Sequence, residues 1–387
     1  MRFLFYYLPS LLSVMLCLAG CQGRRPSYNA SSEAADSEAF MADTVSVCYA
    51  EGFTLQYQTD GTILLDIRDP QGRSRTAYQF LLLPPGTEEP AKSDRTPLRI
   101  PVSRVICMTS LQLSNFIRLG ALDVVSGITS SRHLFNPELK ERLADGRIVR
   151  IGFEGEFDSE VIMAASPDVV LISPFKRGGY DALRESCVPL VPHLGYKELT
   201  PLGQAEWIKL VGLLTGRTHE ANEAFDSIQA HYDYLCSLTK GITSPRPTVL
   251  SGDMKGGSWY AQGGRSFLAR LIEDAGADYF LASDTTSGGV TLDFETVYAR
   301  AESLDYWRIN NSYKGRFTYD ALRQMDERYA DFRAFRQHQV IYCNMSTTPF
   351  YESMPVEPDA VLADFIHIFH PELLPDHTPK YYSTLSQ

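Results

Sequence analysis

One helical pattern, Thr218 to Lys240, constrains the fold of this chain more than any other stretch. Its apolar residues recur at spacings of three and four, which places them in one stripe along a helix. Thr218 is expected to cap the helix and Gly241 to end it, and neither proline nor glycine interrupts it. At about 1.5 Å per residue the helix is roughly 34 Å long, close to the width of a small domain.

The segments on either side of this helix share the same order of strands and helices. Asp158–Ile172 and Asp293–Ile309 each contain an acidic cap, a glutamate two residues later, a short helix, a break and a strand led by aspartate. This repeat predicts two doubly wound, Rossmann-like α/β lobes joined by one long helix, with a ligand cleft beyond the carboxyl ends of the strands. The alternative is one large domain with the long helix in its core.

A small β-meander is expected ahead of the first lobe. Asp60–Gly61 lies between two β-like segments, which is a hairpin signal, and nothing in the meander suggests chemistry. In the second half, the glycine- and threonine-rich segment Thr285–Thr291 is expected to be a loop. The expected organisation is a signal peptide (1–20), a flexible tether (21–41), an N-terminal β extension (42–100), a first lobe (101–198), connecting helices (199–240) and a second lobe (241–387).

The N-terminus has the pattern of a bacterial lipoprotein signal. Arg2 precedes an apolar run from Phe3 to Cys17, and Leu18-Ala19-Gly20-Cys21 matches the lipobox. We expect Cys21 to carry the lipid and to anchor the protein on the periplasmic side of a bacterial membrane; the alternative is an ordinary secretory signal. The later cysteines have no C-x-x-C spacing, and an oxidising compartment would allow one disulfide among them.

Familiar catalytic motifs are absent from the sequence. It has no G-x-S-x-G, H-E-x-x-H, P-loop or dinucleotide motif. The net charge of -11, with no basic stripe, argues against a nucleic-acid partner. We therefore expect a binding protein rather than an enzyme, with no catalytic residue, no cofactor and no metal site of its own. An extracytoplasmic metal-dependent enzyme or hydrolase is the alternative from another class.

The lipobox, the two halves, the spanning helix and the segment Glu160–Ile172 together resemble the iron-complex and vitamin B12 substrate-binding proteins of ABC importers. That family carries Glu-x-hydrophobic-x-Ala-x-x-Pro-Asp-hydrophobic at this place, and the resemblance covers roughly Pro101 to Leu374. It implies a monomer that captures a ligand between its lobes and delivers it to an ABC permease and its ATPase. The implied ligand is an iron chelate, either a ferric siderophore or haem, with cobalamin as the alternative.

The resemblance also implies one permease-docking glutamate on each lobe. The matching positions are Glu160 and Glu295, which are equivalent in the internal repeat. The alternative is that both are ordinary first-turn glutamates that favour the helix dipole.

The cleft-lining loops of the family correspond here to polar, cationic and aromatic residues. Flat aromatic faces with interspersed cations suit a large, partly anionic chelate, and the cations favour acidic iron complexes over neutral cobalamin. Trp259 is expected to face the cleft and to report binding. The implied ligand-binding residues are Thr109, Ser110, Gln112, Arg132, His133, Phe153, Phe175, Lys176, Arg177, Trp259, Tyr260, Arg265, Ser346, Thr347 and Phe350.

Overall fold

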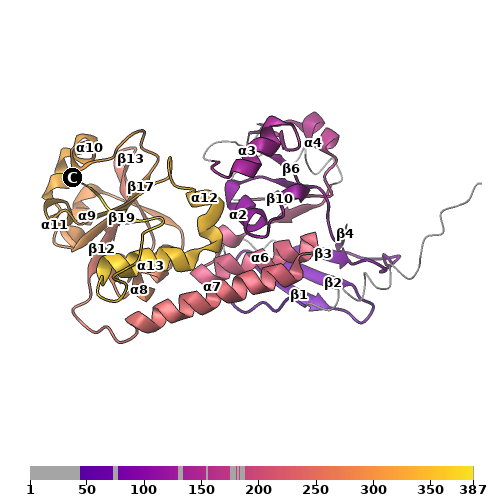
Figure 1. The fold of residues 1–387 in the computed structure, drawn as a ribbon, viewed down its shortest axis with the longest axis horizontal. Helices are drawn as coiled ribbons and strands as arrows, with labels where there is room; N and C mark the ends of the chain where they lie inside the picture. Colours follow the sequence, from indigo (N-terminus) through magenta and orange to yellow (C-terminus); the bar gives the residue numbers. More distant parts are fainter. Residues whose placement is uncertain are drawn as a thin grey trace, which may run out of the picture.

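The chain folds into two α/β lobes and an N-terminal sheet around a pair of long helices (Figure 1). This computed structural model describes residues 44–72, 77–129, 134–153, 156–174, 180, 183 and 188–386. The predicted signal peptide, the tether and Cys21 lie outside the described residues. Within the described ranges, no helix is long and apolar enough to span a membrane.

The first lobe is built on a five-stranded parallel sheet with the order β11-β10-β5-β6-β7. Its central strands are buried along their whole length because helices cover both faces, which is why they read as continuous apolar runs. The strands are β5 (Val105–Cys107), β6 (Val125–Ile128), β7 (Val149–Arg150), β10 (Val169–Ile172) and β11 (Leu190–Pro192), and the helices are α2 (Ser110–Arg118), α3 (Pro137–Ala144) and α4 (Ser159–Ala165). A short hairpin of β8 (Gly152–Phe153) and β9 (Glu156–Phe157) precedes α4.

The second lobe repeats this plan with the order β15-β12-β17-β18-β19. Four strands are parallel and β19 pairs antiparallel with β18 at one edge. The strands are β12 (Thr248–Ser251), β15 (Asp278–Tyr279), β17 (Tyr306–Asn311), β18 (Val340–Asn344) and β19 (Ser383–Thr384), and the helices are α8 (Phe267–Asp274), α9 (Phe294–Ala301), α10 (Tyr319–Met325), α11 (Arg333–Arg336), α12 (Phe350–Ser353) and α13 (Pro358–Phe369). Two α/β lobes therefore confirm the predicted fold class.

A small antiparallel sheet covers part of the second lobe. It contains β13 (Asp253–Lys255), β14 (Ser258–Gln262) and β16 (Gly289–Leu292). The expectation of a loop over Thr285–Thr291 is therefore wrong in its last three residues. Their partner strand β14 supplies backbone hydrogen bonds that override the low strand propensity of glycine.

Helices α6 (Pro201–Thr215) and α7 (Thr218–Thr239) join the two lobes, and α7 runs beneath both of them in Figure 1. The predicted helix is confirmed, although its N-cap is Arg217 rather than Thr218. Its apolar stripe is buried against α6 and α13. Helix α6 is buried at every position, because α7 lies on one side of it and the N-terminal segment on another.

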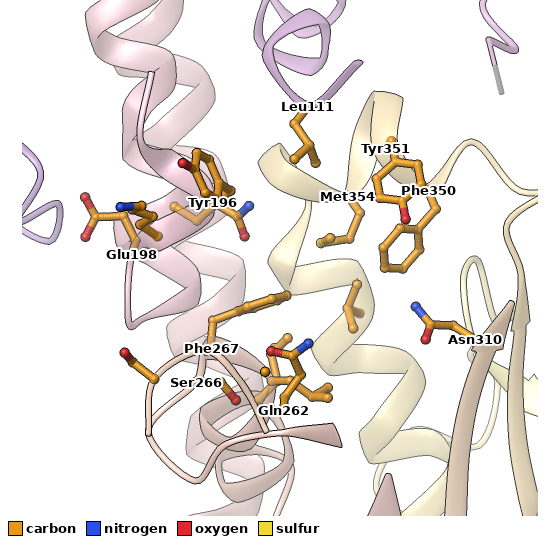
Figure 2. Close-up of a pocket in the computed structure, with 18 of the residues that line it drawn as sticks. Leu111, Tyr196, Glu198, Gln262, Ser266, Phe267, Asn310, Phe350, Tyr351 and Met354 are labelled. Atoms are coloured by element: carbon orange, nitrogen blue, oxygen red, sulfur yellow. The ribbon is translucent and has the colours of Figure 1, made fainter. Parts of the chain in front are cut away.

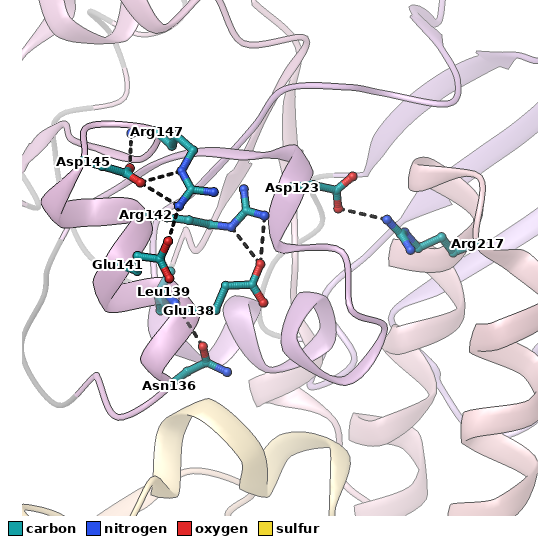
Figure 3. Close-up of polar contacts among 9 residues, drawn as sticks. All are labelled: Asp123, Asn136, Glu138, Leu139, Glu141, Arg142, Asp145, Arg147 and Arg217. Atoms are coloured by element: carbon teal, nitrogen blue, oxygen red, sulfur yellow. Dashed lines mark hydrogen bonds and ion pairs between the residues drawn. The ribbon is translucent and has the colours of Figure 1, made fainter.

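Polar contacts fix the first lobe to its neighbours at both ends. Arg217, in the α6–α7 turn, forms an ion pair of 2.9 Å with Asp123 of the first lobe (Figure 3). At the N-terminus of α3, the carboxylate of Glu352 on α12 accepts the backbone N–H groups of Phe135 and Asn136 at 2.7 and 3.0 Å. Helix α12 also packs against α2, so the lobes touch each other directly as well as through α6 and α7.

The N-terminal sheet contains β1 (Phe53–Tyr57), β2 (Ile63–Ile67), β3 (Tyr78–Leu83) and β4 (Thr96–Arg99). The first three strands form the predicted antiparallel meander, and Gly61 has the positive φ of 84° that its hairpin turn requires. Strand β4 was not predicted, and it pairs parallel with β3. Strand β4 contains Pro97, a residue that argues against a strand in sequence-based prediction, but β4 is an edge strand and edge strands tolerate proline.

Two buried carboxylates hold the N-terminal segment onto the connecting helices. Glu206 of α6 accepts the backbone N–H groups of residues 48–50 at 2.7–3.1 Å, and Lys209 pairs with it at 3.1 Å. Glu198 accepts those of residues 51 and 52 at 3.0 and 2.9 Å. A Cβ on Gly52 would lie 2.6 Å from the Trp207 ring, so only glycine allows this close approach. The sheet is thus bound tightly to the helices that join the lobes.

Replacing Glu206 by glutamine is expected to lower the free energy of unfolding by about 2 kcal/mol, because an amide has one acceptor oxygen for this row of N–H donors and no charge for Lys209. Urea unfolding followed by circular dichroism measures the loss. Glu220→Gln, an exposed first-turn residue of α7, is the matched control. Equal stability of the two variants would contradict the anchoring role of Glu206.

Candidate ligand-binding cleft

A cavity of about 470 Å³ lies where the second lobe meets the connecting segment and the first lobe. Figure 2 shows Tyr196, Phe267, Phe350 and Met354 arranged around it, with Leu111 reaching it from α2. Most of the wall comes from the second lobe, whereas residues 196–198 lie at the end of the first lobe, Gln204 lies on α6 and Gln71 follows β2. The aromatic side chains in the wall are Tyr196, Tyr260, Phe267, Phe350, Tyr351 and Tyr382.

Arg308 of β17 is the cation of this cavity wall, although it is only 7% exposed. One of its terminal nitrogens contacts the Tyr382 hydroxyl, the other lies 3.5 Å from the Ser251 hydroxyl, and its Nε has no hydrogen-bond partner. No carboxylate lies within ion-pair distance of it in the part of the chain that the structure describes. A buried guanidinium without a counter-ion favours an anionic group of a ligand.

The other charged residues of the wall are already neutralised or bound. Lys197 forms an ion pair of 2.8 Å with Asp69, which is almost fully buried. The Glu198 carboxylate accepts the Trp207 indole N–H at 2.8 Å in addition to the two backbone donors described above. Among the described lining residues, Arg308 is therefore the charged side chain without an ion-pair partner, and the buried Asp253 carboxylate acts on it only from beyond ion-pair distance. The neutral polar side chains of the wall are Gln71, Gln204, Gln262, Ser266, Ser287 and Asn310.

Asp364 of α13 positions Tyr382 against Arg308. Its buried carboxylate accepts the backbone N–H groups of residues 380, 381 and 382 at 2.7–3.0 Å, and it lies 2.7 Å from Nε2 of His377. Burial raises the pKa of Tyr382, so its hydroxyl stays protonated and can donate to a ligand or to a neighbouring acceptor. The C-terminal segment is thereby fixed as part of the cavity wall.

Two of the residues implied by the family resemblance line this cavity, Tyr260 and Phe350. Thr109 and Gln112 line a small space of about 10 Å³, room for about one water molecule, which shares Leu111, Tyr196 and Gln204 with the main cavity. Gln112 is buried, and its Oε1 accepts the N–H groups of Met108 and Thr109 at 2.7 and 3.1 Å. These bonds fix the start of α2, and Gln112 is not part of the main cavity wall.

Trp259 does not face the cavity, contrary to expectation. It is 0% exposed, packs among Trp307, Tyr329 and Phe332, and donates its indole N–H to the Ser251 carbonyl at 3.0 Å. Side chains alternate along a strand, so in β14 one of the adjacent aromatic residues must point inward and the other outward. Tyr260 takes the outward position and reaches the cavity.

The remaining implied residues are distributed elsewhere. Arg265 lines another surface cavity, together with Arg246 and Arg270. Phe153 is 73% exposed on the β8–β9 hairpin, away from the main cavity. Ser110, Ser346 and Thr347 are not part of the main cavity wall either. Arg132, His133, Phe175, Lys176 and Arg177 lie outside the described residues.

Sequence reasoning missed Arg308, which was counted only as part of an expected strand. A charged residue in the middle of a buried strand is the signal that could have found it, because such a charge is costly unless it has a purpose. The described ranges contain no cluster of three or more side chains able to hold a metal ion, and Cys48, Cys107, Cys236 and Cys343 are free thiols.

Glu160 and Glu295 occupy equivalent places on the two lobes. Each lies in the first turn of its helix, after an aspartate that caps it: Asp158 accepts the Val161 N–H at 3.0 Å and Asp293 the Thr296 N–H at 2.7 Å. Both glutamates are exposed. The internal repeat found in the sequence thus has the same local geometry in both lobes.

Two α/β lobes, a long connecting helix and an anion-favouring cavity define a two-lobed ligand-binding protein. A family model described as "Periplasmic binding protein" matches residues 105–347, from β5 past the end of β18, and the chain belongs to this family. The family predicted from the sequence is therefore confirmed. Its members are substrate-binding proteins of transport systems, and the match does not include the N-terminal sheet.

Several solved structures share this fold, and a curated relative matches the chain along nearly its whole length. A periplasmic binding protein from Veillonella parvula is 16% identical with a TM-score of 0.58, over 83% of this chain and 98% of that one. A periplasmic heme binding protein from Pseudomonas aeruginosa is 19% identical with a TM-score of 0.57, over 74% and 99%. An ABC-type Fe3+-hydroxamate transport protein from Saccharomonospora viridis is 22% identical with a TM-score of 0.53, over 70% and 94%. An uncharacterised lipoprotein from Methanocaldococcus jannaschii is 24% identical over 99% of both chains.

Proposed function

We propose that this protein captures an iron chelate, a ferric siderophore or haem, in the cavity between its lobes and delivers it to an ABC permease and its ATPase. It acts as a monomer, without a cofactor and without changing the ligand. The single observation that carries this proposal is Arg308, a buried guanidinium that has no ion-pair partner among the described residues and lies in a wall of aromatic rings.

The chemistry of the wall favours an acidic, flat or aromatic ligand. Each stacked ring contributes on the order of 1 kcal/mol beyond the area it buries. The cavity of about 470 Å³ falls in the usual range for small-molecule sites. Arg308 adds a charge-assisted bond to a carboxylate or catecholate of the ligand. Cobalamin, which lacks such an acidic group on its corrin face, remains the alternative ligand and benefits less from this arginine.

Titration of the purified protein with haemin, a ferric siderophore and cobalamin tests the proposal. Calorimetry measures the affinities, and mass analysis of the recovered ligand shows whether it has been altered. We expect haemin or the ferric siderophore to bind more tightly than cobalamin and to be recovered intact. Tight binding of cobalamin alone would overturn the order of ligands, and a cleaved product would favour the enzyme alternative instead.

The lipid anchor is part of the same proposal. Replacing Cys21 by serine removes the thiol that the lipid would modify, so we expect the protein to move from the membrane fraction to the soluble fraction. Cell fractionation with an antibody against the protein measures this shift. Cys48→Ser, an exposed free cysteine of the folded region, serves as the matched control. Unchanged membrane association of the Cys21 variant would contradict the anchor.

A further inference from the structure

The N-terminal sheet, which lies outside the family match, reaches the cavity through one turn. Asp69 to Gly72 follow β2, and the Gly72 N–H bonds to the Asp69 carbonyl at 3.0 Å. Asp69 Oδ1 accepts the Gln71 N–H at 3.0 Å and so fixes the turn. Gln71 is one of the residues that line the main cavity. A segment far from both lobes in sequence therefore contributes to the wall.

The turn is attached to the wall by two direct contacts with Lys197. Gln71 Nε2 donates to the Lys197 carbonyl at 3.1 Å, and the Lys197 Nζ donates to Asp69 Oδ2 at 2.8 Å. Oε1 of Gln71 has no hydrogen-bond partner among the described residues, so a donor on a ligand can use it. Asp69 is almost fully buried, and its charge cancels that of the lysine beside the cavity.

We propose that the turn Asp69–Gly72 is part of the ligand site and determines its specificity. Gln71 offers a hydrogen-bond acceptor to the bound chelate. Asp69 neutralises Lys197, so that the anionic group of the ligand is directed to Arg308 rather than to the lysine. The proposal rests on the proposed function, since it concerns the same cavity, and it assigns a role to the sheet that precedes the family module.

Two substitutions separate the two contributions. Gln71→Ala is expected to weaken binding about fivefold, because one hydrogen bond to the ligand is lost. Asp69→Asn keeps an acceptor oxygen for the turn but releases the charge of Lys197. It is expected to tighten binding of an anionic ligand several-fold at low salt, with a smaller gain at high salt, and to leave a neutral ligand unchanged.

The probes are haemin, which carries two carboxylates, and a neutral ferric hydroxamate, titrated by calorimetry into the full protein. Gln79→Ala is the matched control, because Gln79 lies in the same sheet and bonds to Asp66 away from the cavity. Thermal unfolding of every variant confirms that it is folded. If the unaltered protein binds a probe and both variants bind that probe as tightly as the unaltered protein does, this inference is overturned and the proposed function stands. If the unaltered protein binds neither probe, both are overturned.

Discussion

Replacement of Arg308 by glutamine is expected to weaken the binding of an acidic chelate about 100-fold, because a buried charge-assisted bond to the ligand is lost. Arg308→Lys keeps the charge but not the planar fork of donors, so it should recover part of the affinity. Calorimetric titration with haemin measures both changes, and the neutral ferric hydroxamate should be affected less by either variant.

The matched control for this experiment is Arg300→Gln, an exposed arginine in the last turn of α9 that is not part of the cavity wall. Since Arg308 also contacts Tyr382, thermal unfolding of its variants must accompany the titration. Unchanged haemin affinity in a folded Arg308→Gln variant would remove the main support for an anionic ligand at this position.

Reversing both Glu160 and Glu295 to lysine is expected to abolish uptake while leaving ligand affinity unchanged. The two carboxylates are exposed on separate lobes, so they can meet cationic groups of a permease, and a like charge at each contact would repel it. Cellular uptake of radiolabelled iron chelate measures the first effect, and calorimetry on the purified variant measures the second.

The reversal of Glu88 and Glu220 makes the same change in net charge at two other exposed positions and is the matched control. Normal uptake by the Glu160/Glu295 variant would show that docking uses another surface. A loss of ligand affinity would instead assign the two glutamates to the fold or the cavity. On the second lobe, Arg328 lies 4.0 Å from Glu295 and partly neutralises its charge. The single change Glu295→Lys should therefore reduce uptake less than the single change Glu160→Lys.

The features that the sequence predicted well are those encoded by local pattern. The long helix follows from one apolar stripe, and the β1–β2 hairpin follows from Asp60–Gly61. Tertiary partners decided the features that it missed. Strand β4 exists because β3 offers it a parallel neighbour, in spite of Pro97. The local sequence of β4 therefore contains no signal strong enough to predict a strand.

The cavity was harder to predict than the fold because side-chain direction in a short strand depends on one residue of register. Trp259 and Tyr260 are adjacent aromatic residues, and only the pairing of β14 determines which of them is buried. Arg308 and Gln71 were missed for a related reason. Each reaches the cavity from a segment that carries no familiar motif, so the packing of distant elements, rather than composition, brings them there.

Asp364 holds Tyr382 in the cavity wall, so ligand binding depends on a correctly folded C-terminal segment. Tyr382 follows the last helix of the chain, whereas Gln71 precedes both lobes, yet both belong to one cavity wall. During synthesis, the wall is completed only after the segment beyond α13 has folded back onto Arg308. A chain that is halted before that step would lack part of the cavity wall, so ligand binding would depend on an intact C-terminal segment.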